Sequence, residues 1–353
     1  MKRKKQAIAV IVAAAILAAL VYLQFRQWQQ FDWRAFKAGT SGINWWLVLW
    51  GVLMVHVADF LRALRWKVFL RPSRPKVPWT SLIAPQFVGF AGLAILGRPG
   101  ELIRPYLIAK RADTPVTAQV AVWFVERAFD ITSVTIIVAA DIFFVLPPHL
   151  RQQWQTAGYI LIAFSAAFVV ALYALWKQGP AIADFACRLI TPISGNIAGK
   201  VGRKLRTASG ALHTIHDWQS FFEASLISGI IWILVSVAYR EVSLAFPAHT
   251  GLHALGIPEV ILLMGASVAG GVLQLPVVGG GAQLASIAVL SSSFHDVVRP
   301  ELAVAAGILY WLVTFVSVAP IGLVLARFEH VSLRKVAQEP EPNGDLLETD
   351  AAN

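Results

Sequence analysis

Three charged residues lie within five positions of one another in a hydrophobic run between residues 118 and 146. Glu126 and Asp130 are four residues apart and share a helix face, and Arg127 can pair with Asp130 at the i, i+3 spacing. Ionisable groups inside a membrane helix cost a few kcal/mol and need a protein or water partner. The cluster is therefore predicted to line a polar site or to form an ion-pair network that locks helices together.

A second group lies between Gly97 and Tyr106, where two glycines and two prolines prevent a regular helix. Arg98 and Arg104 carry forked donors that suit a phosphate group. Glu101 can hold one guanidinium in place or take the proton or cation that drives transport. The competing interpretation is a plain basic loop at a membrane surface.

The third group, near the end of an apolar run, is His56, Asp59, Arg62 and Arg65. Asp59 can pair with Arg62, and it is deep enough in the run to be a site residue. Both arginines are interpreted as snorkelling to the membrane surface. Asp141 is interpreted either as a further partner of the charged groups or as a residue of the outer interface.

Other reaction chemistries lack support. His213 with His216, and His249 with His253, have helical metal-ligand spacing but no accompanying carboxylate or cysteine set, so no metal or cofactor is predicted. Phosphate-binding loops, dinucleotide fingerprints and nucleophile elbows are absent in a suitable context. A single cysteine, Cys187, excludes an intramolecular disulfide.

The composition indicates what must position these charges. Of 353 residues, 57% are hydrophobic and 14% are charged, whereas soluble domains are about a quarter charged. The chain is therefore predicted to be an all-α, polytopic membrane bundle. Runs long enough to cross a bilayer lie near 7–25, 44–61, 118–146, 157–176, 223–246 and 301–326.

Two further apolar stretches, 80–109 and 257–294, are broken by glycine and proline. We predict that both are re-entrant hairpins, because irregular backbone at membrane depth must be buried in protein or line a wet cavity. Two kinked spanning helices, giving eight spans, are the alternative. Paired interrupted segments also suggest inverted repeats with a binding site where the segments meet.

Positive charge sets the orientation. Segments 1–5, 62–111, 177–206 and 327–335 carry 23 of the 30 lysines and arginines, which places them and both termini in the cytoplasm of a cell-membrane protein. The net charge of +10 is thus assigned to topology, and nucleic acid is not expected as a partner. The membrane domain is predicted to span 1–336, with an amphipathic segment at 181–219 and a disordered acidic tail at 337–353.

The amphipathic segment has two interpretations. Its apolar residues recur at helical spacing between 196 and 219, as in a helix that lies on anionic lipid. A cytoplasmic connector packed against the bundle explains the pattern equally well.

The run from Gly97 to Tyr106, followed by Glu126-Arg127 and Asp130, resembles the flippase-like family that includes the membrane region of lysylphosphatidylglycerol synthases. Residues 62–66 and the glycines at 279–281 are similar to further landmarks of that family. Members usually carry a glutamate after these glycines, where this chain has Gln283, which puts the role of that acid in doubt. The synthases of the family also carry a soluble aminoacyl-transferase domain after the membrane region, and synthase activity is not expected of this sequence.

The resemblance implies movement of an anionic or glycosylated phospholipid, or of a polyprenyl-phosphate-linked lipid, between leaflets. A membrane enzyme acting on a lipid-linked substrate and a scaffold for a partner glycosyltransferase are the alternatives; no enzyme activity is predicted. Gly97, Gly100, Gly279, Gly280 and Gly281 are assigned to the backbone of the site. The predicted substrate contacts are Asp59, Arg98, Glu101, Arg104, Tyr106, Glu126, Arg127, Asp130 and Gln283.

Overall fold

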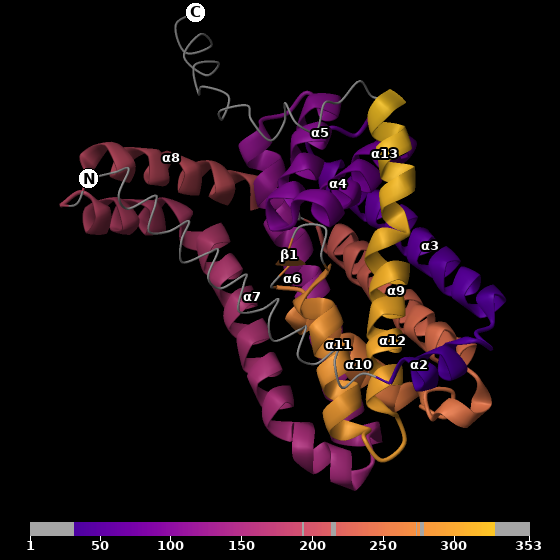
Figure 1. Ribbon diagram of the computed structural model, residues 1–353. Coiled ribbons are helices and arrows are strands. Elements are labelled where there is room, and N and C mark those ends of the chain that lie inside the picture. The colour runs from indigo at the N-terminus through magenta and orange to yellow at the C-terminus, as the bar shows by residue number, and fades with distance from the viewer. Residues whose placement is uncertain (1–31, 193, 213–216, 273, 276–278, 329–353) are drawn as a thin grey trace, which may run out of the picture.

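The computed structural model describes residues 32–328, apart from 193, 213–216, 273 and 276–278. Helices dominate this part of the chain, and long helices run side by side in a bundle (Figure 1). The helices are α2 (Trp33–Thr40), α3 (Trp45–Leu70), α4 (Ile83–Leu96), α5 (Ile103–Ala112), α6 (Val116–Ala140), α7 (Pro148–Ile190), α8 (Gly195–Leu212), α9 (Trp218–Ala245), α10 (Ile257–Gly270), α11 (Gly281–Ser293), α12 (Pro300–Trp311) and α13 (Val318–Phe328).

Short elements join or extend these helices. Three are 3₁₀ turns: η1 (Trp79–Leu82), η2 (Arg98–Leu102) and η4 (Ala248–Thr250). Two are π turns: η3 (Asp141–Val145) and η5 (Leu312–Val316). Two-residue strands β1 (Gln274–Leu275) and β2 (Gly279–Gly280) pair antiparallel, with Gln274 opposite Gly280.

Capping residues fix where several helices begin. Asn44 accepts a hydrogen bond from the N–H of Trp46 at 3.1 Å, and Asp217 accepts one from the N–H of Ser220 at 2.5 Å. Asp32 caps α2 in the same way, and the backbone N–H of Ala35 lowers the pKa of its carboxyl group. These caps start each helix at a defined residue, outside the apolar run that follows.

Six apolar helical stretches are long enough to cross a membrane: Trp45–Leu70, Trp79–Leu96, Val116–Val145, Pro148–Leu175, Trp218–Ala245 and Pro300–Phe328. Five of them confirm predicted spans, whereas the predicted span 7–25 lies outside the described residues. Large hydrophobic side chains cover the outer surface, with Trp46 79% and Phe144 82% exposed. This surface suits lipid, and the protein is a multi-pass helical membrane protein.

The core forms where α3 and α9 pack along their length. Gly51 permits the close approach, because a Cβ atom there would lie 3.3 Å from the carbonyl oxygen of Ala238. Val55, Ala58 and Val242 are buried beside it. Small residues at the contact are typical of helix pairs in membranes, where close packing replaces the hydrophobic effect between helices.

Residues 79–112 form a hairpin, called here the first hairpin, with α4 and α5 as its arms. Its two ends lie together, because Arg111 Nη1 donates to the carbonyl oxygen of Ser81 at 3.0 Å. Arg74, which follows α3, donates to the carbonyl oxygen of Asp113 at 2.6 Å. The chain therefore returns to the end of the bundle where α3 finishes. Gly97, at φ 70°, starts the turn.

Residues 257–293 form the second hairpin, with α10 and α11 as its arms and the β1–β2 pair at its tip. Its ends lie together at the opposite end of the bundle from those of the first hairpin (Figure 1). There, Trp154 Nε1 donates to Ser293 Oγ at 3.1 Å, and Gly251 contacts the backbone of Val297. The predicted entry from opposite ends therefore matches the arrangement of the bundle. Whether the hairpins stop within the membrane stays a prediction. One arm of the first hairpin, Trp79–Leu96, is by itself long and apolar enough to cross a membrane.

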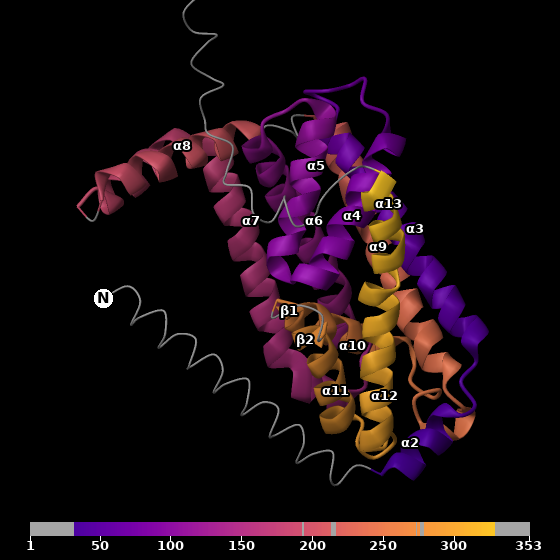
Figure 2. The ribbon, with the colours of Figure 1, turned by 45° about the horizontal axis from the view of Figure 1, so that its top comes forward.

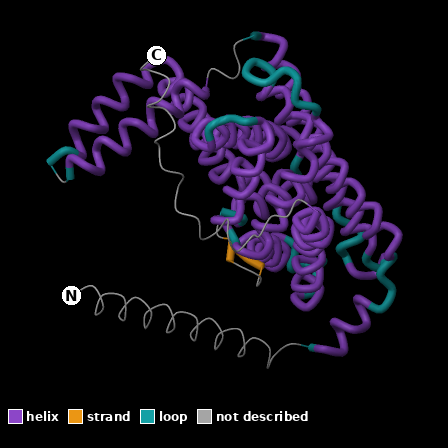
Figure 3. The backbone as a smooth tube through the Cα atoms, turned by 90° about the horizontal axis from the view of Figure 1, so that it is seen from above, coloured by secondary structure: helices purple, strands orange, loops and turns teal. Residues whose placement is uncertain are grey.

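Helix α7 continues well past the predicted span 157–176. It bends at Gln178, whose φ/ψ of −124°/24° is not helical, just before Pro180. Helix α8 then folds back along it, with Ser209 Oγ donating to the carbonyl oxygen of Leu175 at 2.9 Å. Residues 178–212, called here the arm, project sideways from the bundle (Figures 2 and 3). Within the segment 181–219, the structure has the end of α7 and the helix α8, which covers most of the stretch 196–219 that was predicted to be an amphipathic helix. Its placement on lipid stays a prediction, and the tail at 337–353 lies outside the described residues.

Candidate functional site

Arg65 is the centre of a buried ion network. Its guanidinium is 0% exposed and donates to Asp130 Oδ1 at 2.7 Å and to Glu126 Oε1 at 2.7 Å. It also donates to Ser228 Oγ at 2.6 Å, so it links α3, α6 and α9. The predicted snorkelling of Arg65 is wrong, because its face of α3 packs against α6 and α9 instead of the membrane surface.

Arg104 joins the same network from the first hairpin. Its Nη2 pairs with Glu126 Oε2, and its Nη1 donates to Gln86 Oε1 at 3.0 Å. The guanidinium carbon also lies 4.6 Å from the centre of the Trp66 ring, a cation–π contact. These contacts hold Arg104 firmly and tie α5 to α3, α4 and α6.

Arg127 is the most accessible cation of the network, with its side chain 27% exposed. Its Nη2 lies 3.1 Å from Asp130 Oδ2, which confirms the predicted i, i+3 pair, and 3.8 Å from Glu126 Oε2. Arg127 Nε has no hydrogen-bond partner within the described part of the chain. Three guanidiniums thus share the carboxylates of Glu126 and Asp130. Glu101 lines the cavity beside Arg104 and Arg127 and adds a further carboxylate near them.

Asp59 and Arg62 form a second buried pair beside the network. Arg62 Nη1 donates to Asp59 Oδ1 at 2.9 Å, which confirms the predicted pairing. Both residues are buried, so the predicted snorkelling of Arg62 is also wrong. Asp59 Oδ2 and Arg62 Nε lack hydrogen-bond partners among the described residues. Polar atoms of this pair are therefore left for a ligand or water.

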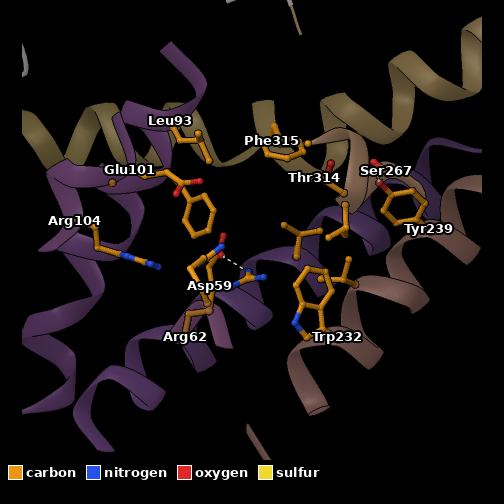
Figure 4. Close-up of a pocket in the computed structure, with 17 residues that line it drawn as sticks. Asp59, Arg62, Leu93, Glu101, Arg104, Trp232, Tyr239, Ser267, Thr314 and Phe315 are labelled. Carbon is orange, nitrogen blue, oxygen red and sulfur yellow. Dashed lines mark hydrogen bonds and ion pairs between the residues drawn. The ribbon is translucent and has the colours of Figure 1, made fainter. Parts of the chain in front are cut away.

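Asp59, Arg62, Arg104 and Arg127 line a cavity of about 160 Å³ (Figure 4). Glu101 at the turn of the first hairpin and Gly271 at the tip of the second both line it. The two broken segments therefore meet at one polar cavity, as expected for paired interrupted segments. The lining residues are Val55, Asp59, Arg62, Gly89, Phe90, Leu93, Glu101, Arg104, Arg127, Trp232, Val235, Tyr239, Ser267, Val268, Gly271, Thr314 and Phe315.

Comparison with protein families identifies this architecture. The family described as "Lysylphosphatidylglycerol synthase TM region" matches residues 7–322. The chain belongs to this family. Searches of curated proteins and of solved structures give no match. Membership confirms the resemblance drawn from the charged motifs, and it associates the chain with membrane proteins that act on lipids.

For this member of the lysylphosphatidylglycerol synthase membrane-region family, the predicted site residues divide into three sets. Asp59, Glu101, Arg104 and Arg127 line the cavity. Glu126 and Asp130 lie behind them and hold the arginines. Of Arg98, only the backbone is described, at the start of η2.

The remaining predicted residues do not line the cavity. Tyr106 packs with the apolar cluster that contains Val88 and Leu107. Gln283 lies on α11, where its backbone carbonyl oxygen faces Gly307. Gly97 and Gly100 form the turn of the first hairpin, whereas the glycines at 279–281 form β2 and the start of α11.

Sequence reasoning missed the uncharged half of the cavity in this family member. Trp232, Tyr239, Ser267 and Thr314 line the wall opposite Glu101 and Arg104 (Figure 4). Single hydroxyls within apolar helices give no pattern, because serine and threonine are common in spans and can bond to their own helix. The burial of Arg65 could have been predicted, because Glu126 and Asp130 lie one turn apart on a membrane helix and need a buried cation as partner.

Proposed function

We propose that the protein moves an anionic or glycosylated lipid between the two leaflets, with the lipid phosphate held by arginines in the central cavity. A phospholipid or a polyprenyl-phosphate-linked lipid has the required chemistry. The observation that carries the proposal is a cavity lined by Arg62, Arg104 and Arg127, placed where two hairpins from opposite ends of the bundle meet.

Arg127 and Arg62 are the phosphate ligands in this proposal. Arg127 shares its carboxylate partners with Arg65 and Arg104, and Arg62 keeps an unpaired Nε beside the cavity. A phosphate group would accept forked guanidinium hydrogen bonds from these arginines. Arg104 is instead a positioning residue, because Glu126, Gln86 and Trp66 already hold its guanidinium.

The arrangement also lowers the free-energy barrier to translocation. A charged headgroup in hydrocarbon costs several kcal/mol, and the cavity offers it fixed charges in place of water. The acyl tails can stay in the bilayer, because the surrounding helices expose large apolar side chains. Each hairpin enters from a different end, so outward movement of one hairpin opens the cavity toward one surface only.

Transport is favoured over catalysis by the state of the acids. Glu126 and Asp130 are each bound to two guanidiniums. A carboxylate held in this way is a weak base, because its charged form is stabilised. We therefore propose that these acids hold the arginines in position.

From the distribution of lysine and arginine, we also propose that the protein lies in the cell membrane with both termini in the cytoplasm.

Exchange of labelled lipid in liposomes tests the proposal. Purified protein is expected to expose acyl-labelled phosphatidylglycerol to an external quencher faster than protein-free liposomes do. Arg127→Gln is expected to slow exchange about tenfold or more, since a hydrogen bond to a charged group contributes about 1.5–3 kcal/mol. In this variant Asp130 keeps its hydrogen bonds from Arg65 and Trp232, so the protein should still fold.

Arg206→Gln is the matched control, because it removes an exposed arginine on the arm, far from the cavity lining. It should exchange lipid at the wild-type rate. Wild-type protein that exchanges neither anionic phospholipid nor a polyprenyl phosphate would refute the proposal and favour the scaffold alternative.

A further inference from the structure

Asp141 is a buried acid that does not line the central cavity. It lies where α6 passes into the π turn η3, and it is 3% exposed. Its Oδ2 has no hydrogen-bond partner within the described part of the chain. The nearest charge on α6, Asp130, is about three turns away, so Asp141 stands apart from the buried ion network. A buried acid in this position needs a partner of another kind.

The elements packed against Asp141 bring one further charge toward it, and that charge is negative. Helix α10 packs against η3, and Glu259 in its first turn is close enough to interact electrostatically with Asp141. From α7, Arg151 donates to the carbonyl oxygen of Leu146 at 3.2 Å, and His149 is exposed. Among the described residues, the two carboxyl groups therefore interact without a cation between them.

The surroundings of the two carboxyl groups differ. Glu259 Oε2 turns back toward the start of its helix, where it would lie 2.7 Å from a Cβ atom at Gly256. The free N–H groups and the dipole at a helix start stabilise an anion. Asp141 is buried without such a donor, and a buried charge without a partner is costly. A proton shared by the pair is therefore held by Asp141.

A proton fits this pair better than a metal ion does. Calcium and magnesium take six or more oxygen ligands, and the pair offers two carboxyl groups. Groups of three or more acidic, histidine or cysteine side chains suited to a metal are absent from the part of the chain that the structure describes. A proton needs one carboxylate oxygen, which Asp141 Oδ2 supplies. The protonated acid can then donate a charge-assisted hydrogen bond to Glu259.

The charge of this pair bears on the position of α10. The helix packs closely on α6, because a Cβ atom at Gly265 would lie 3.5 Å from Val138 Cβ. Further along α10, Ser267 and Val268 line the central cavity. Two ionised carboxylates would repel the start of α10 from η3. Since α10 is a continuous helix, the cavity wall would move with it.

We propose that Asp141 and Glu259 form a proton-binding site that holds the second hairpin against α6 and η3. With the proton bound, the pair shares a hydrogen bond and α10 stays packed; when the proton leaves, α10 loosens. The site lies toward the end of the bundle where the second hairpin begins and ends, which is the outer end in the predicted topology (Figure 1). Neither acid lines the cavity, so the test does not depend on lipid transport.

The pH dependence of thermal unfolding in detergent tests the proposal. The folded state binds a proton that the unfolded chain releases, so the stability of the wild type should fall as the pH rises. From about pH 5 to about pH 8, its Tm is expected to fall by about 2–4 °C more than that of Asp141→Asn, which stays neutral. Glu259→Gln removes the like charge and should show a smaller fall than the wild type. Asp113→Asn, at an exposed acid, is the matched control and should keep the wild-type dependence.

A disulfide between α6 and α10 reports the packing directly. In a Cys187→Ser background, Val138→Cys with Gly265→Cys places two Cβ atoms 3.5 Å apart, within the range for a disulfide. At high pH, oxidation should be slower with Asp141 than with Asp141→Asn, and at low pH the two rates should be equal. The comparison is made at each pH, so ionisation of the thiols cancels.

Two results would overturn the proposal. One is an equal pH dependence of Tm in the wild type and in Asp141→Asn. The other is a rise in Tm at high pH on addition of Na⁺, Mg²⁺ or Ca²⁺ that Asp141→Asn abolishes, because the pair would then bind a metal ion instead of a proton.

Discussion

The two hairpins that meet at the cavity share a backbone device and differ in side-chain chemistry. In the first, a Cβ atom at Gly100 would collide with the backbone of Gly92. In the second, one at Gly270 would collide with the backbone of Gly281. Both hairpins thus bring their arms together through glycine. Yet residues 79–112 contain five charged side chains, whereas residues 257–293 contain only Glu259.

This difference shows how one architecture can supply two kinds of contact. Glycine contacts set the shape of each hairpin, and the side chains around the turns decide what each half of the cavity can bind. Charge enters from α3, the first hairpin and α6, where Arg62, Arg104 and Arg127 each have an acid partner. Hydroxyls enter from α9, the second hairpin and η5. The site is therefore ionic on one side and neutral on the other.

The largest expected effect concerns which side of the membrane each hairpin starts from, because labelling is all or none. In a Cys187→Ser background, Lys110→Cys probes the end of the first hairpin and Asp296→Cys the end of the second; both positions are exposed. An impermeant maleimide should label Asp296→Cys from outside and Lys110→Cys from the cytoplasm. Labelling of both from outside would favour eight spans and remove the comparison between opposed hairpins.

Removal of the central cation should cost the most stability. Arg65→Met leaves Glu126 and Asp130 without their shared buried partner, a change that typically costs about 3–5 kcal/mol. Thermal unfolding in detergent should show a large fall in Tm. Unchanged unfolding would mean that the ionic half of the cavity is not a structural unit.

Glycine substitutions should affect both hairpins alike. Gly100→Ala and Gly270→Ala force atoms into neighbouring backbone and should each cost about 1–3 kcal/mol, as overpacking does. Gly229→Ala is the control, since a Cβ atom there meets nothing within 4 Å, and it should stabilise α9 by up to about 1 kcal/mol. A cost at one hairpin alone would show that the two are not built on the same principle.

The smallest effect is expected outside both hairpins, at the exposed Arg206–Asp184 pair on the arm. Both side chains are about half exposed, and such pairs contribute about 0–1 kcal/mol. Asp184→Ala should therefore leave Tm nearly unchanged. A large loss would indicate that the arm is part of the folded core.

The features that could be predicted are those that depart from a regular, apolar helix, because such departures are costly inside a membrane. Long apolar runs located five described spans, and breaks at glycine and proline located both hairpins. Charges in a span marked Glu126, Arg127 and Asp130 for the same reason. Arg65 was misassigned because an arginine near a helix end has an ordinary explanation, and only packing shows which face it occupies.

Other features depend on tertiary contacts that leave no local pattern. The bend at Gln178 and the return of α8 depend on close packing of Gly179 against Ser209. The grouping of Tyr239, Ser267 and Thr314 comes from three helices distant in sequence. Tyr106 and Gln283 were predicted as ligands on the strength of neighbouring motifs; neither is among the residues that line the cavity, and their role stays a prediction.

Blocking the cavity tests most directly whether lipid headgroups pass through it. Val268 lines the cavity from α10, whereas Val272, at the tip of the same hairpin, is 66% exposed and lies outside the lining. In liposomes, Val268→Trp should reduce exchange of phosphatidylglycerol to the protein-free rate, and Val272→Trp should leave it at the wild-type rate. Wild-type exchange by a folded Val268→Trp variant would contradict the account.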